Sequence, residues 1–157
     1  MTNSQAIANK YAEQVISGKV SAGQLVREAC ARYLSDLNTF RFEPELADHA
    51  LEFIQNLTHT TGEAAGRKFI LEPWQVFIIT NLFGFVGPDG ARRFSRAYIE
   101  VPRKNGKSTF ASAIMLYGLL ADGEAGAQPG ADAAAGAGAD EEGDVVDAEY
   151  TEEARDN

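Results

Sequence analysis

The sequence is poor in cysteine, histidine and long hydrophobic runs. Cys30 is the single cysteine among 157 residues, so no internal disulfide can form and a reducing, intracellular setting is expected. Its apolar neighbours favour a small buried thiol over a reactive one. No window approaches 18 apolar residues and no signal peptide opens the chain, so we expect a cytoplasmic protein without a membrane partner. His49 and His59 have no cysteine or carboxylate at converging spacing, and no metal is assigned to them.

Acidic residues are concentrated at one end of the chain. Residues 1–120 contain 13 Lys and Arg and 11 Asp and Glu, whereas residues 121–157 contain one and 12, which gives the overall net charge of −9. The acidic balance therefore does not exclude a nucleic-acid partner for residues 1–120. Residues 123–157 are rich in Gly, Ala and acid, with Tyr150 as the only aromatic. So few large apolar groups cannot offset about 1–2 kcal/mol of backbone entropy per residue, and this tail is predicted to be disordered.

Apolar residues recur at helical spacing in several segments. Ser4 and Gly18 suit the two ends of the first, and Ser21 to Gln24 has the pattern of a capping box before the second. Pro44 and Pro73 suit the first position of a helix. The predicted helices are residues 4–17, a segment from Ser21 to about Leu37, segments that begin at Pro44 and at Pro73, and residues 107–121, closed by Asp122 and Gly123.

The stretch IEVPRKNGKSTFAS, residues 99–112, ends like a phosphate-binding loop. Such a loop follows a buried strand, bends tightly and opens a helix whose first N–H groups face the phosphates. Here residues 94–101 are predicted to form a strand, of which 97–101 leads directly into a bend at 102–106. The standard pattern has a glycine where this chain has Val101, and Pro102 removes one amide donor. Glu100 would have to lie at a strand end or pair with an arginine.

Two further features have alternative interpretations. Arg103 and Lys104 form a compact cationic site with Lys107, or else a solvated charged turn. The amide of Gln75, in LEPWQ, suits the edge of adenine because it donates and accepts at once, but spacing alone favours a polar residue on a helix surface.

The runs LEPWQVFIITNLFGFV and RRFSRAYIEVPRKNGKSTFASAIMLYGLLADGE together resemble the large terminase subunit of tailed bacteriophages, the ATPase that drives DNA into the capsid. The resemblance covers residues 4–127. In that family the loop is a deviant Walker A with basic residues in place of the first glycines, which accounts for Val101 and Pro102. The resemblance implies an adenine contact for Gln75, with phosphate and magnesium positions at Arg103, Lys107, Ser108 and Thr109. The predicted ATP site comprises Gln75, Arg103, Lys104, Asn105, Gly106, Lys107, Ser108 and Thr109, with Ser108 as the Mg²⁺ ligand.

The predicted fold class is α/β, with the first strand, P-loop and helix of an incomplete P-loop ATPase domain after a helical region. The three predicted parts are a helical N-terminal region at 1–62, the start of the ATPase domain at 63–122, and the disordered tail at 123–157. The family's motor also needs a strand that ends in Asp-Glu, a coupling motif and a nuclease domain, none of which is recognised here. Asp140-Glu141 is rejected as that pair, since the preceding AAAGAGA has no β-branched residue. No catalytic residue is therefore assigned, and weak or absent ATPase activity is expected.

The tail from about Pro129, and especially GDVVDAEYTEEARDN, resembles the disordered C-terminus of the bacterial chaperone DnaK, with a seam near residues 126–130. By resemblance the partners of a complete terminase are double-stranded DNA, the portal and the small terminase subunit, in the host cytoplasm, with a homo-oligomer only if the domain is complete. The alternative function is a non-catalytic, truncated or chimeric binding module with a chaperone-like tail. A third possibility is a chain without a folded function, since one strand of a parallel sheet leaves both its edges unpaired.

Overall fold

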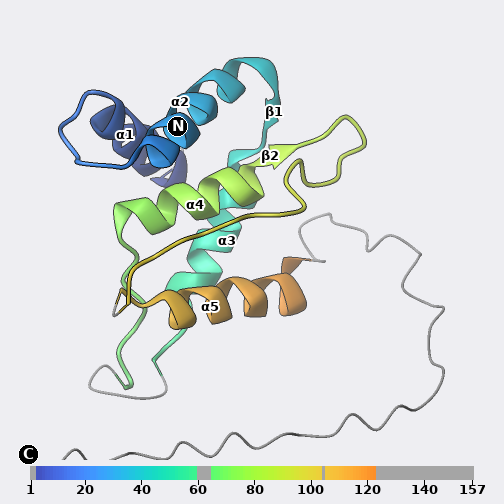
Figure 1. The fold of residues 1–157 in the computed structure, drawn as a ribbon. Coiled ribbons are helices and arrows are strands. Elements are labelled where there is room, and N and C mark those ends of the chain that lie inside the picture. Colours follow the sequence, from blue (N-terminus) through green and yellow to red (C-terminus); the bar gives the residue numbers. More distant parts are fainter. Residues whose placement is uncertain (1–2, 60–64, 104, 123–157) are drawn as a thin grey trace, which may run out of the picture.

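The computed structural model describes residues 3–59, 65–103 and 105–122. Within these ranges the chain is mostly helical (Figure 1). The predicted helices are all present, and the prolines at 44 and 73 stand at the first helical position as expected. The helices are α1 (Asn3–Ile16), α2 (Gln24–Thr39), α3 (Pro44–Asn56), α4 (Pro73–Gly84) and α5 (Lys107–Leu120).

The predicted start of the second helix is wrong. α2 begins at Gln24, and its N-cap is Gly23 without a side-chain capping bond, so the pattern at Ser21 does not act as a capping box. A capping box forms instead at α4, where Glu72 and Gln75 exchange side-chain and backbone bonds. The first N–H groups of any helix need partners, and at α4 the capping box supplies them for Glu72 and Gln75.

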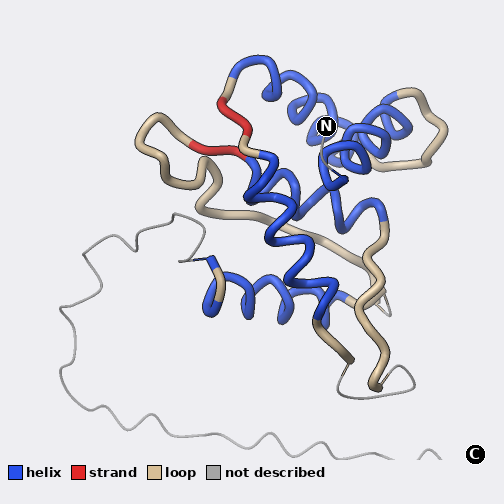
Figure 2. The backbone as a smooth tube through the Cα atoms, turned by 180° about the vertical axis from the view of Figure 1, so that it is seen from behind, coloured by secondary structure: helices blue, strands red, loops and turns tan. Residues whose placement is uncertain are grey.

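A two-stranded sheet joins the two halves of the described structure. β1 (Arg41–Phe42) pairs antiparallel with β2 (Phe85–Val86), so that Phe42 lies opposite Phe85 (Figure 2). The backbone N–H of Glu43 also donates to the carbonyl of Gly84 at 2.7 Å. This pairing places the end of α2 and the start of α3 beside the end of α4.

The predicted strand at residues 94–101 is wrong. Residues 95–101 run as an extended segment between α4 and α5 in Figure 1, but they belong to no strand in the described structure. A strand satisfies its backbone groups through a neighbouring strand, and no described strand pairs with residues 95–101. Tyr98 is 87% exposed, and Glu100 is exposed as well, so the carboxylate that would be awkward in a covered strand lies in solvent.

α4 occupies the centre of the described structure, between α1 and α2 on one side and α5 on the other (Figure 1). It carries no charged side chain, as expected of a helix that is buried on several faces. Its side chains contribute to two hydrophobic clusters. One combines α3, α4 and α5 around Ile54, Ile79, Phe83 and Tyr117, and the other combines α1, α2 and α4 around Val15, Cys30, Tyr33 and Phe77.

Cys30 is fully buried in the second cluster, as its pattern predicted. Burial raises the pKa of its thiol to about 11, which keeps the sulfur protonated and unreactive near neutral pH. None of the described helices is both long enough and apolar enough to cross a membrane.

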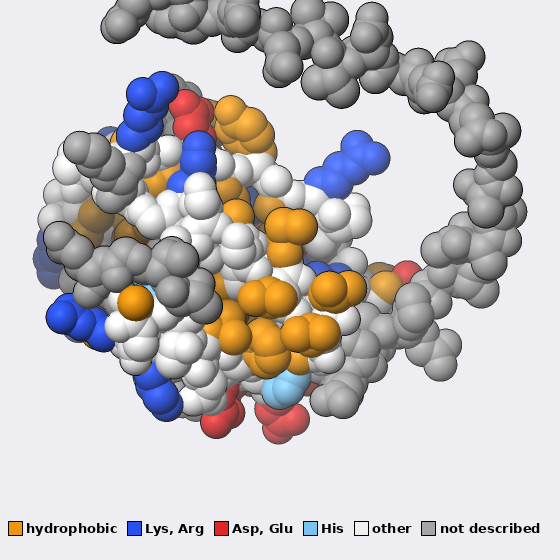
Figure 3. Space-filling model, turned by 90° about the horizontal axis from the view of Figure 1, so that it is seen from below, with side chains coloured by type: hydrophobic (Ala, Val, Ile, Leu, Met, Phe, Trp, Pro, Cys, Tyr) orange, Lys and Arg blue, Asp and Glu red, His pale blue; other side chains and the backbone are white. Residues whose placement is uncertain are grey.

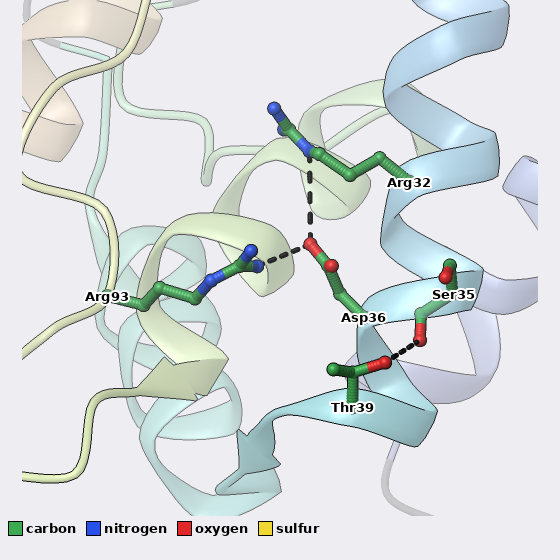
Figure 4. Close-up of polar contacts among 5 residues, drawn as sticks. All are labelled: Arg32, Ser35, Asp36, Thr39 and Arg93. Carbon is green, nitrogen blue, oxygen red and sulfur yellow. Dashed lines mark hydrogen bonds and ion pairs between the residues drawn. The ribbon is translucent and has the colours of Figure 1, made fainter.

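Asp36 of α2 connects the helical region to the segment after β2. Its side chain is 9% exposed and its carboxylate pairs with Arg93, while Arg32 approaches the same oxygen at 3.9 Å (Figure 4). The guanidinium of Arg93 also lies 3.6 Å from the ring centre of Phe40 and 4.6 Å from that of Phe94. The path of the chain after β2 is thus fixed before it crosses toward α5.

Candidate nucleotide-binding loop

Gly106 forms the turn at which the loop becomes a helix. Its backbone is left-handed, with φ 68° and ψ 17°, and it is the N-cap of α5. An added Cβ at Gly106 would meet nothing within 4 Å, so the backbone conformation, and not crowding, is what favours glycine. The carbonyl of Gly106 accepts the N–H of Phe110 at 2.9 Å, which leaves the N–H groups of residues 107–109 directed out of the helix end.

The polar side chains around this turn lie on the surface. Arg103, Asn105, Lys107, Ser108 and Thr109 are all exposed. Neither Arg103 nor Lys107 forms an ion pair with any residue in the described ranges. Lys104 lies outside the described residues. The loop therefore combines unpaired helix N–H groups, two cations and two hydroxyls, which is the donor set that binds a phosphate group.

An aromatic contact ties the beginning of α5 to the beginning of α4. Phe110 is 2% exposed, and Trp74 packs against it edge-on with ring centres 5.7 Å apart. Both helices begin on the same side of the molecule, the left side in Figure 1. Gln75 and the loop are thereby brought to one side, although they are more than 25 positions apart in the sequence.

Gln75 has a local role that its sequence pattern did not reveal. Its side chain is largely buried, with 9% of the residue exposed, and its Oε1 accepts the N–H of Glu72 at 2.9 Å. Glu72 is not one of the residues usual at an N-cap, so only the glutamine three positions later could have hinted at a capping box in the Glu-Pro-Trp-Gln order. The expectation of a polar residue on the helix surface is wrong, because the residue is a buried cap.

The other end of α5 is fixed by residues that the sequence did not single out. Arg92 pairs with Asp122 and lies 4.8 Å over the ring of Phe83. Burial lowers the pKa of Arg92, and the same cause raises that of Tyr117. The hydroxyl of Tyr117 in turn lies 3.0 Å from Nδ1 of His49, so His49 helps to anchor α5. The helix that carries the loop is therefore held at both ends.

Comparison with known proteins gives one match. Residues 73–140 match the family model for the ATPase domain of the terminase large subunit. The match begins at the first residue of α4 and includes the loop and α5, but it covers fewer than half of the 157 residues. No curated protein and no solved structure gave a significant match.

The matched range also bears on the two ends of the chain. The helices at 3–56 lie outside it, so the predicted resemblance of that region stays a prediction. At the other end the match runs to residue 140, past the predicted seam at 126–130. Nothing in the comparisons supports the resemblance of the tail to DnaK. The tail and its predicted disorder lie outside the described residues.

Proposed function

We propose that this chain binds Mg²⁺-ATP at the loop before α5 and is the nucleotide-binding part of a terminase-type DNA-packaging ATPase. The observation that supports this most directly is the left-handed Gly106 at the start of α5, with Lys107 and Ser108 exposed immediately after it. This turn lies within the range that matches the terminase ATPase domain. A helix start of this geometry, inside the matched range, supports the proposal of a phosphate site at the loop.

The residues of the loop fit the parts of a nucleotide. The N–H groups of residues 107–109 would bind phosphate oxygens, and Lys107 would compensate charge at the terminal phosphates. Ser108 would hold the magnesium ion, which neutralises charge on the phosphates when bound. Arg103 and Lys104 would add positive charge at the mouth of the loop, while Asn105 and Thr109 would donate further hydrogen bonds.

Gln75 would recognise the adenine edge without giving up its capping bond. A carbonyl oxygen has two lone pairs, so Oε1 can accept the N–H of Glu72 and a base amino group together, and the amide nitrogen keeps its donors. The capping bond also limits the rotation of the side chain. The same contact that stabilises α4 would then preorganise the base site.

Hydrolysis would require groups beyond those assigned here. No described residue near the loop is assigned as the one that orients the attacking water, and the sequence offers no convincing Asp-Glu pair. We therefore propose that the chain binds nucleotide and turns it over slowly or not at all by itself. Its partners in packaging would be those of the family, namely double-stranded DNA, the portal and the small terminase subunit.

Calorimetric titration of the full chain with ATP and magnesium tests this proposal. We expect saturable binding that Lys107→Ala weakens by at least about tenfold, since a charge-assisted bond to phosphate is lost. Lys19→Ala is the matched control, because Lys19 is an exposed lysine in the turn after α1. The affinity of this variant for ATP should equal that of the parent chain.

Absence of heat at millimolar ATP would refute the proposal and favour the alternative of a non-catalytic binding module. A steady ATPase rate that Lys107→Ala abolishes would instead contradict the expected lack of turnover, while leaving ATP binding in place.

A further inference from the structure

Two cations at the loop before α5 have no acidic partner in the described ranges. Arg103 and Lys107 are exposed and lie beyond ion-pair distance of any described carboxylate, whereas Arg41, Arg92 and Arg93 are each paired. In Figure 3, which views the molecule from the side of α5, Lys and Arg side chains gather mainly on the left, the side on which α5 begins. The loop is therefore open to a carboxylate as well as to a phosphate, because both anions pair with the same cations and helix N–H groups.

The chain itself carries a concentrated source of carboxylates. Residues 141–157, which we call the acidic segment, contain eight Asp and Glu against one Arg, a net charge of −7. This segment lies beyond the range that matches the terminase ATPase domain, which ends at residue 140. Its charge is opposite in sign to that of the loop. The match of charges makes the acidic segment a candidate ligand for the loop in the same chain.

The distance from the end of α5 to the loop agrees with the reach of the intervening chain. α5 has 14 residues, and at about 1.5 Å per residue its two ends are about 20 Å apart. Between α5 and the acidic segment, residues 123–140 include 13 Gly and Ala among 18 residues. A chain of this length and composition spans about 23 Å on average. An intramolecular ligand has its highest effective concentration when the reach of its linker equals the span, as it does here.

Other exposed cations are less well placed for the acidic segment. Lys10, Lys19 and Arg27 belong to α1, to the turn after it and to α2. α4 separates that side of the described structure from α5 (Figure 1). A chain that leaves the end of α5 reaches the loop along a single helix, but it would have to pass over α4 to reach those three residues.

We propose that the acidic segment occupies the loop before α5 when nucleotide is absent, and that it competes with ATP for Arg103, Lys107 and the N–H groups at the start of α5. This regulation rests on the proposed function, because it concerns the same site. Carboxylates of the segment pair with the two cations and with the positive end of the α5 dipole. Mg²⁺-ATP would also bind at the proposed magnesium and adenine positions, which the segment leaves empty, so nucleotide displaces it.

Calorimetric titration with Mg²⁺-ATP tests the competition in two full-length variants that gain the same charge. One replaces four acids of the segment by their amides, namely Glu141→Gln, Glu142→Gln, Asp144→Asn and Asp147→Asn. The control replaces four exposed acids of α1, α2 and α3, namely Glu13→Gln, Glu28→Gln, Glu45→Gln and Glu52→Gln. At about 20 mM salt we expect the first variant to bind ATP at least about twofold more tightly than the parent and the control to bind equally. At about 500 mM salt the gain should vanish, because screening removes the contact.

Zero-length carbodiimide cross-linking of the parent chain detects the contact itself. The reagent joins a lysine amine to a carboxylate that touches it, and mass spectrometry identifies the pair. Lys107 should be linked to the acidic segment, and Mg²⁺-ATP should suppress the link. Lys19 is the control, since it is exposed on the far side of α4 and should not be linked to the segment.

The outcomes separate this inference from the proposed function. If Lys107 formed no link to the acidic segment, the inference would be wrong, and any gain in affinity would reflect general charge repulsion. A link that Mg²⁺-ATP left unchanged would overturn the competition. Equal affinities of the two variants at low salt would do the same while leaving ATP binding in place. If no chain bound ATP, the proposed function would fail, and the link to Lys107 would still decide whether the segment docks at the loop.

Discussion

At the scale of single residues, the buried pairing of Asp36 with Arg93 is expected to contribute to stability. The buried carboxylate of Asp36 accepts from Arg93, whose side chain is 21% exposed. Asp36→Asn should lower the free energy of unfolding by about 2 kcal/mol, because the guanidinium loses its charge-assisted bond while it remains largely desolvated. Urea unfolding followed by circular dichroism measures the change.

Arg32→Ala provides the comparison for Asp36. The side chain of Arg32 is 54% exposed and reaches the same carboxylate only at 3.9 Å, so its removal should change stability by no more than about 0.5 kcal/mol. Equal effects of the two substitutions would show that the Arg93 contact is worth no more than a surface ion pair.

Single residues also show what the sequence could predict and what it could not. Gly106 and Pro73 were placed correctly because glycine permits a left-handed turn and proline restricts its own φ, and both are purely local properties. The bond between Asp36 and Arg93 joins positions 57 apart in the sequence, and neither residue carries a local signal for the other. The side-chain roles proposed at the loop remain predictions, since geometry shows where Lys107 and Ser108 lie and not what they bind.

At the scale of elements, two glycines in helices should respond in opposite directions to alanine. At Gly84, the last residue of α4, a Cβ would overlap the ring of Phe42, with Cζ only 2.7 Å away. Gly84→Ala should therefore destabilise the protein by about 2 kcal/mol, through displacement of the ring from β1. Gly118→Ala, in the open surface of α5, should raise stability by about 0.5–1 kcal/mol.

Thermal unfolding by circular dichroism at low protein concentration compares these two variants. A neutral Gly84→Ala would indicate that Phe42 moves aside freely and that the contact between β1 and the end of α4 contributes little. A destabilising Gly118→Ala would indicate that the outer face of α5 is already covered within one chain, contrary to its exposure.

The elements differ in how far their own sequence determines them. Helices satisfy their backbone groups internally, and local spacing was enough to predict all five, with only the start of α2 misplaced. A strand depends on a partner elsewhere in the chain. The strand expected at 94–101 had suitable residues but pairs with no described strand, whereas the two-residue strands β1 and β2 are too short to leave a pattern.

At the scale of the whole molecule, α4 belongs to both hydrophobic clusters, and this should make the described helices unfold together. Val15 is fully buried in the cluster of α1 and α2, while Trp74, the only tryptophan, packs on Phe110 in the other. Val15→Ala should cost about 2 kcal/mol. We expect the unfolding midpoints from Trp74 fluorescence and from circular dichroism to fall together.

The neighbouring residue supplies the control for this experiment. Ile16 is 50% exposed at the end of α1. Ile16→Ala should therefore leave the unfolding midpoints from Trp74 fluorescence and from circular dichroism nearly unchanged. If Val15→Ala lowered the helical midpoint and left the Trp74 midpoint unchanged, the helical region and the loop-bearing part would be independent units, as a boundary at residues 62 and 63 predicts. Coincident shifts would mean instead that α4 couples them, and that the stability of the candidate nucleotide loop depends on helices outside the matched range.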